Sequence, residues 1–300
     1  MPGDALNHLL RQIVDYAGLF PPARLDMGPA VEEFARHHAS GDAWMLARFV
    51  VPASRLDAFE SAAASFLPTE SNATPWGLSV LPGDNLEAAR QRIDAFNQTH
   101  GNPEAGLATV EAVEYRPGSL DDIARAARLF EDLEIYFELP HDVDPEPWMQ
   151  EVAKYGGRGK IRSGGITSEA FPSAAEFARF LATAQKSGLP MKATAGLHHP
   201  LRGEYALTYE EASPNGTMHG FFNVFLAAAW ARQGLDEASL AVLLEERDPN
   251  AFEIDGDSVR WREHVLRADE IADSRDQFLL SYGSCSFAEP VGDLRSLGWL

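Results

Sequence analysis

Cysteine and long apolar runs are scarce in this sequence. A single cysteine, Cys285, stands among the 300 residues, so no disulfide can form within the chain and nothing indicates an oxidising compartment. No apolar run approaches the roughly 20 residues that a membrane span requires, and the acidic and polar residues near the amino terminus are wrong for a signal peptide. We therefore expect a soluble cytoplasmic protein that does not enter a membrane.

Positive charge is also scarce. The chain has 25 Lys and Arg against 45 Asp and Glu, which gives a formal net charge of −20. Most of such a surface repels phosphate backbones and anionic membranes, so nucleic acid and membranes are not expected partners. We expect a small-molecule substrate. If that substrate is anionic, local Arg and Lys must overcome the overall field.

Nucleotide-binding motifs are missing too. Neither G-x-G-x-x-G nor G-x-x-x-x-G-K-[ST] occurs, which argues against a nucleotide cofactor, and we expect no cofactor. Apolar residues, by contrast, are plentiful: they make up 45% of the chain, with 17 Phe and 6 Trp, enough to fill a large core.

Short runs rich in Val, Ile, Phe, Tyr and Leu alternate with longer stretches of helical periodicity. This alternation is typical of βα units around a parallel sheet. Eight such strands close a barrel, so the sequence predicts an α/β protein with one (β/α)₈ TIM barrel over residues 1–300. The expected strands are Val14–Phe20, Trp44–Pro52, Trp76–Leu81, Leu107–Tyr115, Glu134–Leu139, Gly159–Ser163, Pro190–Leu197 and Gln277–Ser284.

The helical stretches fall between these strands. Ser173 and Glu176 form an S-x-x-E capping box, which fixes the start of one helix. The expected helices are Pro29–Ala39, Arg55–Leu67, Leu86–Thr99, Leu120–Leu133, Pro145–Tyr155, Ser173–Ser187, His219–Gln233 and Val291–Leu297.

Three segments depart from this rhythm. Residues 197–217 form a connection long enough for a lid or binding loop. Residues 235–277 form an insertion before the last strand, with a helix, a hairpin that turns at Asp255–Gly256 and a further helical piece. The first strand is ambiguous because Ala5–Ala17 also has helical spacing. If this segment does not form a barrel strand, the hairpin at Phe252–Leu266 would have to supply the eighth strand.

The helix expected at His219–Gln233 is apolar on nearly all sides. Such a helix must be covered by more than the barrel. Either the insertion or a second subunit could cover it, so a homodimer is one expectation.

In a (β/α)₈ barrel the reacting groups lie at the carboxyl ends of the strands and in the loops that follow. Those positions hold an unusual number of charged and polar residues. An unpaired charge buried in a barrel is costly, so a cluster of this kind indicates a site or a compensated network. The candidates are Asp15, Arg48, Glu111 or Glu114, Glu138, Lys160, Arg162, Lys192, Thr194, His198, His199, Tyr282, Ser284 and Ser286.

Two lysines, Lys160 and Lys192, stand on consecutive expected strands. Lys160 and Arg162 are two residues apart and point to the same side, as do Lys192 and Thr194. If both faces point inward, repulsion should lower a lysine pKa towards neutrality and make that lysine a nucleophile for imine formation. The alternative is that the lysines pair with Glu114 and Glu138 in a structural charge network.

These two strands carry a family resemblance. Their sequences, GKIRSGGIT and MKATAGLHHP, contain K-x-x-x-G-G and K-x-x-x-G. Consecutive barrel strands of this kind, here in swapped order, are similar to the last strands of class I aldolases of the deoxyribose-phosphate aldolase type, in which one lysine forms an imine and the other tunes it. The resemblance implies lysine chemistry on a barrel and no particular substrate.

Other residues suggest further roles. His198 or His199 with Glu114 and Glu138 would suit a divalent metal, although no metal-binding histidine spacing is present. The segment Tyr282–Phe287 leads into a helix, and Ser284 and Ser286 there could bind an anion together with Arg162 or Arg202.

We therefore expect an enzyme acting on a small polar, anionic carbonyl or hydroxy compound by lyase or aldolase-type chemistry. Lys160 would form the imine, Lys192 would tune it, and Glu138 or His198 would move protons. Residues expected to contact substrate are Arg162, Thr194, Glu114, Asp15, Arg48, His199, Tyr282, Ser284 and Ser286. A metal-dependent isomerase or hydrolase and a non-catalytic barrel that binds a metabolite or a protein partner remain alternatives.

Overall fold

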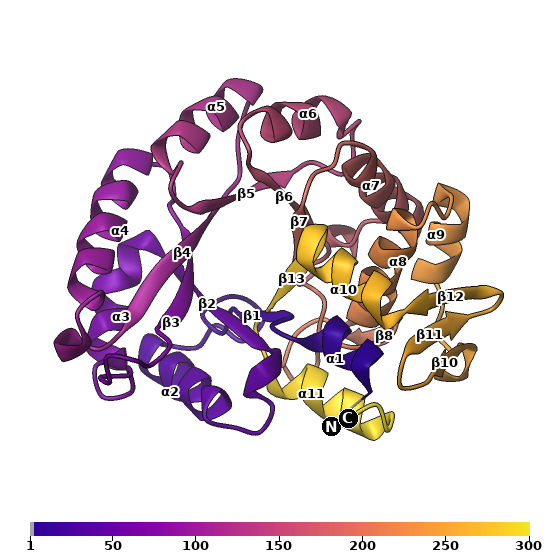
Figure 1. The fold of residues 1–300 in the computed structure, drawn as a ribbon, viewed down its shortest axis with the longest axis horizontal. Coiled ribbons are helices and arrows are strands. Elements are labelled where there is room, and N and C mark those ends of the chain that lie inside the picture. Colours follow the sequence, from indigo (N-terminus) through magenta and orange to yellow (C-terminus); the bar gives the residue numbers. More distant parts are fainter. Residues whose placement is uncertain (1–2) are drawn as a thin grey trace.

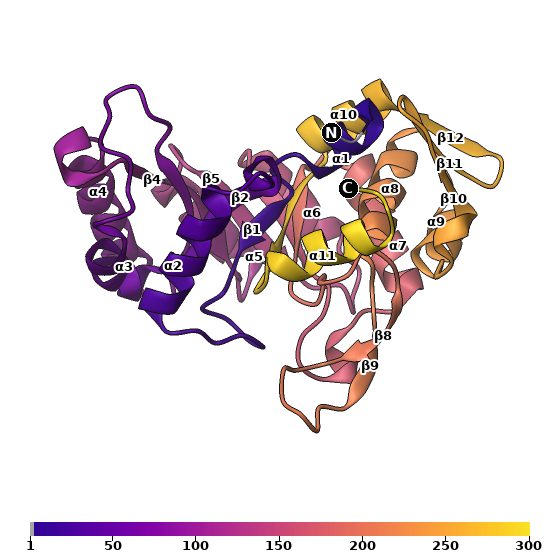
Figure 2. The ribbon, with the colours of Figure 1, turned by 90° about the horizontal axis from the view of Figure 1, so that it is seen from below.

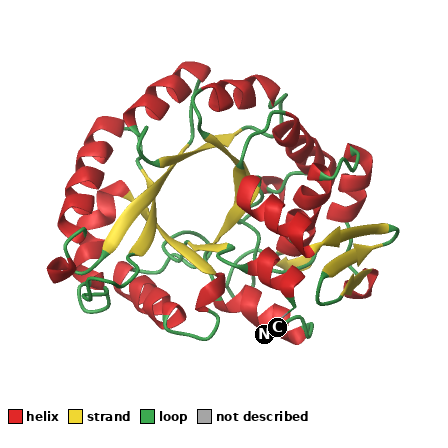
Figure 3. Ribbon diagram, viewed as in Figure 1, coloured by secondary structure: helices red, strands yellow, loops and turns green. Residues whose placement is uncertain are grey.

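In residues 3–300, which the computed structural model describes, eight parallel strands close into a barrel (Figures 1 and 3). Every neighbouring pair in the ring is parallel. Around the barrel the order is β1 (Val14–Tyr16), β13 (Leu279–Ser284), β7 (Met191–Thr194), β6 (Arg158–Arg162), β5 (Glu134–Leu139), β4 (Ala108–Tyr115), β3 (Trp76–Leu81) and β2 (Leu46–Pro52).

The predicted (β/α)₈ barrel is confirmed, and β3 and β5 cover the predicted residues. The first strand is shorter than predicted. Helix α1 (Asp4–Leu10) forms the start of the ambiguous segment. The extended backbone of β1 ends at Tyr16 because the chain then turns, and the Phe20 N–H donates to the Ala17 carbonyl at 2.9 Å. This short β1 still pairs with both of its neighbours, so the later hairpin is not needed in the barrel.

Helices surround the barrel, and the apolar core fills the space between the two layers. Phe34 of α2, for example, meets Phe49 of β2 and Trp76 of β3, with ring centroids 5.4 and 4.9 Å apart. The predicted capping box is present at the start of α7, where Ser173 and Glu176 each bind the other's backbone. The surrounding helices are α2 (Met27–His38), α3 (Leu56–Ala63), α4 (Leu86–His100), α5 (Leu120–Leu129), α6 (Glu146–Lys154), α7 (Ala174–Lys186), α8 (Phe221–Arg232) and α11 (Ala288–Ser296).

The chain makes a long excursion between β7 and β13. The predicted lid segment contains a two-stranded hairpin, β8 (Gly203–Ala206) and β9 (Asn215–Met218), which projects from the body of the protein (Figure 2). After α8 come α9, a three-stranded antiparallel sheet and α10, which lie outside the barrel. Their bounds are Glu237–Leu244 (α9), Phe252–Ile254 (β10), Ser258–Trp261 (β11), His264–Arg267 (β12) and Ala268–Gln277 (α10).

Five short 3₁₀ turns complete the described secondary structure in residues 3–300. They lie at Ala43–Met45, Ala53–Arg55, Pro103–Ala105, Ser168–Ala170 and Pro249–Ala251.

The apolar helix α8 is covered within one chain. Every residue from Phe221 to Ala231 is buried, against α7, α9, α10 and β13. Of the two expected ways to cover this helix, the structure has the inserted segment, through α9 and α10, so the helix gives no reason to expect a dimer. In residues 3–300, none of the helices has both the length and the apolar character needed to span a bilayer.

Candidate active site

A cavity of about 290 Å³ opens at the carboxyl ends of the barrel strands. One side, formed by β1–β3 and the loop after β1, is apolar; the other, formed by β4–β7, carries most of the polar groups. The lining residues are Ala17, Phe20, Pro21, Pro22, Val50, Leu81, Glu114, Glu138, Lys160, Arg162, Gly165, Ile166, Thr194, Ala195, Gly196, His198, Gly283 and Cys285.

The two lysines occupy matching positions in adjacent strands. Lys160 in β6 is paired in register with Lys192 in β7, so both side chains enter the barrel from neighbouring positions. The Lys160 amine lies 2.7 Å from Glu114 Oε2, and the Lys192 amine lies 2.7 Å from Glu114 Oε1. One carboxylate therefore joins the two ammonium groups.

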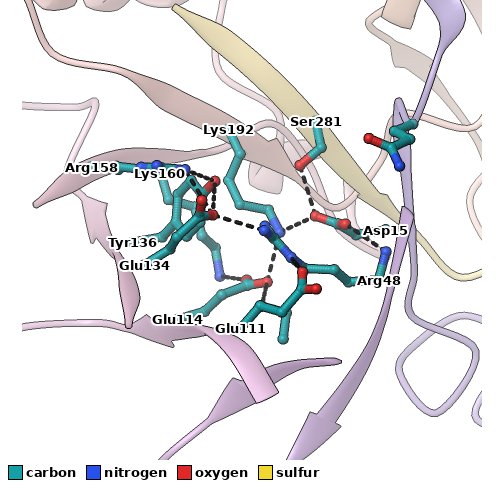
Figure 4. Close-up of polar contacts among 12 residues, drawn as sticks. Asp15, Arg48, Glu111, Glu114, Glu134, Tyr136, Arg158, Lys160, Lys192 and Ser281 are labelled. Atoms are coloured by element: carbon teal, nitrogen blue, oxygen red, sulfur yellow. Dashed lines mark hydrogen bonds and ion pairs between the residues drawn. The ribbon is translucent and has the colours of Figure 1, made fainter. Parts of the chain in front are cut away.

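Further polar groups complete this network (Figure 4). Asp15 on β1 binds the Lys192 amine and accepts hydrogen bonds from Ser281 Oγ at 2.7 Å and from the Arg48 backbone N–H at 3.1 Å. On the other side, Ser79 Oγ donates to Glu114 at 2.7 Å. The buried carboxylates thus have hydrogen-bond donors as well as charge partners, which is what makes a buried ion network tolerable.

The expected lowering of a lysine pKa is wrong for Lys192. Burial alone would lower that pKa, but attraction to Asp15 and Glu114 outweighs burial and raises it above the ordinary value. Burial alone would likewise raise the pKa of Glu114, yet the two lysines hold it far below its usual range. The charges balance here because Asp15 and Glu114 contact the lysine amines directly, which the sequence alone does not reveal.

Only one of the two lysines lines the cavity. Lys160 does so and is 5% exposed, whereas its neighbour Lys192 is fully buried outside the cavity lining, with its amine 5.2 Å from the centre of the Tyr136 ring. The whole chain has four lysines, and the other two, Lys154 and Lys186, are largely exposed on the surface. Lys160 is therefore the lysine that a ligand in the cavity can reach.

Glu138 and Arg162 stand above Lys160 in the cavity wall. Glu138 Oε2 lies 3.1 Å from the Lys160 amine, and Glu138 Oε1 lies 3.9 Å from the Arg162 guanidinium. The Arg162 side chain is 49% exposed, so it can still bind a ligand. Thr194 lines the wall on the next strand, two residues beyond Lys192, as the strand spacing predicted.

The glycines of the two lysine motifs allow their loops to pack together. A Cβ on Gly196 would lie 2.9 Å from the Gly164 Cα, so neither loop has room for a larger residue there. Gly196 and the preceding Ala195 both have positive φ, and Ser163 Oγ donates to the Ala195 carbonyl at 2.7 Å. This tight turn fixes the wall beside Lys160.

His198 reaches the cavity, and its neighbour His199 does not. Glu289 of α11 contacts His198 Nδ1 at 3.2 Å and accepts a hydrogen bond from Tyr209 of the hairpin at 2.6 Å. Burial raises the pKa of Glu289, but these two hydrogen bonds outweigh it and lower the pKa. Glu289 is thus an ionised acceptor, so His198 Nδ1 carries a hydrogen that points to it and Nε2 is the ring nitrogen left for a ligand.

Several other candidate residues lie outside the cavity. His199 stacks on Tyr205 and contacts Asp293, while Arg202 contacts His219. Arg48 is only the third residue of β2, so it lies towards the amino ends of the strands, where it pairs with Glu111 and Glu134.

The last strand also differs from expectation. Ser281 points inward to Asp15, so Tyr282 points outward and stacks on Phe221 of α8. Ser284 and Ser286 bind backbone N–H groups of the adjoining turn instead of lining the cavity. Asp15 remains close to the site, but beneath its floor.

The residues of the metal-dependent alternative are arranged differently. Glu114 and Glu138 contact lysines, and in the described part of the chain no three His, Cys, Asp or Glu side chains are grouped in a way that could hold a metal ion. Cys285 lines the cavity, but burial raises the pKa of its thiol to about 11, which disfavours a nucleophilic role.

Sequence reasoning missed four residues of the site: Ser79, Ser281, Tyr209 and Glu289. The two serines are small strand residues, and nothing in their local sequence distinguishes them from core positions. Glu289 lies in the first turn of α11, where an acidic residue is usual.

Comparison with known proteins finds neither a protein-family model nor a curated protein that matches this chain. The barrel that the aldolase resemblance implied is present. The finer resemblance to class I aldolases rests on the two lysine-bearing strands alone.

Proposed function

We propose that the protein is a lyase of the aldolase type in which Lys160 forms an imine with a small carbonyl compound. The observation that carries this proposal is the position of the Lys160 amine, in the wall of a cavity, 3.1 Å from Glu138 and beside a second, buried lysine. Imine-forming enzymes need an amine that a carbonyl can reach, with a proton acceptor beside it.

The first step is transfer of a proton from the Lys160 ammonium to Glu138. Lys192 occupies one oxygen of Glu114 and adds a positive charge nearby, and both effects favour this transfer. The free amine then adds to the substrate carbonyl carbon. The resulting carbinolamine takes up a proton at its oxygen and loses water, which leaves an iminium ion on Lys160.

The iminium ion then accepts the electron pair of one of the other bonds of the α carbon, the carbon next to the iminium carbon. If that bond is carbon–hydrogen, the proton passes to a base. If it is carbon–carbon, a hydroxyl group on the departing carbon gives its proton to the base and becomes the carbonyl group of the second product, and the enamine left on Lys160 takes up a proton at carbon. His198 and Glu138 are the groups in the cavity wall that can take and return this proton. Hydrolysis of the imine by water releases the product and restores the lysine.

Exchange of α-hydrogen for deuterium tests the proposal. Short aldehydes, ketones and 2-oxo acids are incubated with the protein in D₂O and followed by proton NMR. We expect exchange with at least one compound, its loss in Lys160→Met, and its retention in Lys186→Met, which changes an exposed lysine. Exchange that persists in Lys160→Met, or no enzyme-dependent exchange with any compound, would contradict the proposal.

A further inference from the structure

The cations of the cavity are unequally available to a ligand. Of the described residues that line it, Lys160 and Arg162 carry positive charge. Lys160 is held by two carboxylates at 2.7 and 3.1 Å, whereas Arg162 has one carboxylate contact at 3.9 Å and a half-exposed side chain. Arg162 is therefore the group that can bind a ligand anion. Its planar guanidinium group can donate two parallel hydrogen bonds to one carboxylate.

The spacing of these two cations suits a carboxylate next to a carbonyl. A single carboxylate, that of Glu138, already contacts both the Lys160 amine and the Arg162 guanidinium. A 2-oxo acid has its carboxylate one bond away from the carbonyl carbon. It can thus place the carboxylate on Arg162 and the carbonyl carbon at Lys160 over a similarly short span.

The opposite wall selects against polar chains. The residues from β1–β3 and the loop after β1 offer the ligand apolar side chains. A sugar would leave its hydroxyl groups without partners on this side, whereas an alkyl chain would be buried there. These residues are Ala17, Phe20, Pro21, Pro22, Val50 and Leu81.

The cavity is less suited to a ligand phosphate group than to a ligand carboxylate. The first turn of α11, after the last barrel strand, carries the ionised Glu289, and Ser286 Oγ is already bound to the Glu289 backbone N–H at 3.2 Å. Neither Ser284 nor Ser286 lines the cavity. The usual phosphate position of a barrel is thus occupied by a negative side chain.

We propose that the substrate is a 2-oxo acid with a short apolar chain, with its carboxylate on Arg162 and its chain against the β1–β3 wall. This rests on the proposed imine chemistry at Lys160. Each methylene buried against that wall should strengthen binding about four-fold, until the cavity is full.

Competition for reductive trapping tests this substrate class. Equal concentrations of two carbonyl compounds compete for the protein in the presence of borohydride, which reduces the iminium ion to a stable secondary amine, and intact mass gives the share of each adduct. The pairs are 2-oxopentanoate against 2-pentanone, 2-oxopentanoate against 2-oxopropanoate, and 2-oxopentanoate against glyceraldehyde 3-phosphate. Variants are Arg162→Gln, Arg162→Lys and, as a control, Arg36→Gln, which changes an exposed arginine outside the cavity.

We expect 2-oxopentanoate to win each competition at least ten-fold in the unchanged protein and in Arg36→Gln. In Arg162→Gln its advantage over 2-pentanone should fall to about two-fold or less, and Arg162→Lys should be intermediate. Equal trapping of the ketone, or preference for the phosphorylated aldehyde, would overturn the substrate class while leaving imine formation intact. Absence of a Lys160 adduct with every compound would overturn the proposed function itself.

Discussion

The amines of Lys160 and Lys192 bind opposite oxygens of the Glu114 carboxylate, each at 2.7 Å. The two strands place these lysines side by side, and the carboxylate between them keeps their charges compensated. With Asp15 beneath and Glu138 above, three carboxylates surround two ammonium groups. The site is therefore a balanced ion network with one end open to a cavity.

Removal of the central carboxylate should destabilise the fold. Glu114→Gln leaves two buried ammonium groups without their shared partner, and breaking such a network costs about 3–5 kcal/mol. Urea denaturation measures the free energy of unfolding. The control is Glu111→Gln, since Glu111 is partly exposed and pairs with Arg48, and it should cost about 1 kcal/mol or less. Equal small losses in both variants would show that Glu114 does not balance the lysines.

The stability of the protein should fall in mild acid because of His219. Burial lowers the pKa of this ring from 6.5 to about 4. Between these pH values the unfolded chain binds a proton at His219 that the folded protein does not. Unfolding therefore becomes easier as the pH falls from about 6.5 to 4, by at most about 1.4 kcal/mol per pH unit for this one group.

Urea denaturation at several pH values isolates this effect. His219→Gln removes the titrating ring, so its stability should fall less steeply than that of the unchanged protein, by a total difference on the order of 3 kcal/mol. His264→Gln, at a partly exposed position, should follow the unchanged protein. Parallel curves for His219→Gln and the unchanged protein would refute the prediction.

The single thiol should react slowly in the folded protein. Cys285 is 5% exposed, and burial raises its pKa from 9.0 to about 11, so its reactive thiolate is about 100-fold less abundant than in a free thiol. Labelling with iodoacetamide at pH 8, followed by mass, should be at least that much slower than in 8 M urea. Similar rates in both conditions would mean that Cys285 is neither shielded nor perturbed.

Glu289 should matter for catalysis through His198. Glu289→Gln removes the ionised acceptor that sets the hydrogen of His198 on Nδ1, so we expect the rate of α-hydrogen exchange to fall about ten-fold or more. Asp293→Asn is the matched control, because Asp293 contacts His199 in the same way but outside the cavity. Equal losses in both variants would assign Glu289 a purely structural role.

The sequence allowed the barrel to be predicted because strand and helix periodicities are local. The same reasoning put Lys160 with Arg162, and Lys192 with Thr194, on one side of their strands, and the structure has Lys160, Arg162 and Thr194 lining the cavity. It did not predict the sign of the Lys192 pKa shift. Asp15 lies 177 residues away in the chain, and its contact with Lys192 exists only once the barrel has closed.

Two of the candidates that lie outside the cavity, Tyr282 and Arg48, do so for different physical reasons. A strand alternates its side chains, but its sequence does not say which set points inward; Tyr282 belongs to the outer set because Ser281 belongs to the inner one. Arg48 was assigned to the wrong end of the barrel because β2 continues four residues beyond it, to Pro52.

Peptide mapping after borohydride reduction tests the central claim most directly. The protein is incubated with a 2-oxo acid and, separately, with a small aldehyde, reduced and digested, and each of the four lysines is examined by mass. We expect an adduct on Lys160, none on the buried Lys192, and only background on Lys154 and Lys186. Adducts confined to Lys154 and Lys186, or an adduct on Lys192 in place of Lys160, would contradict it.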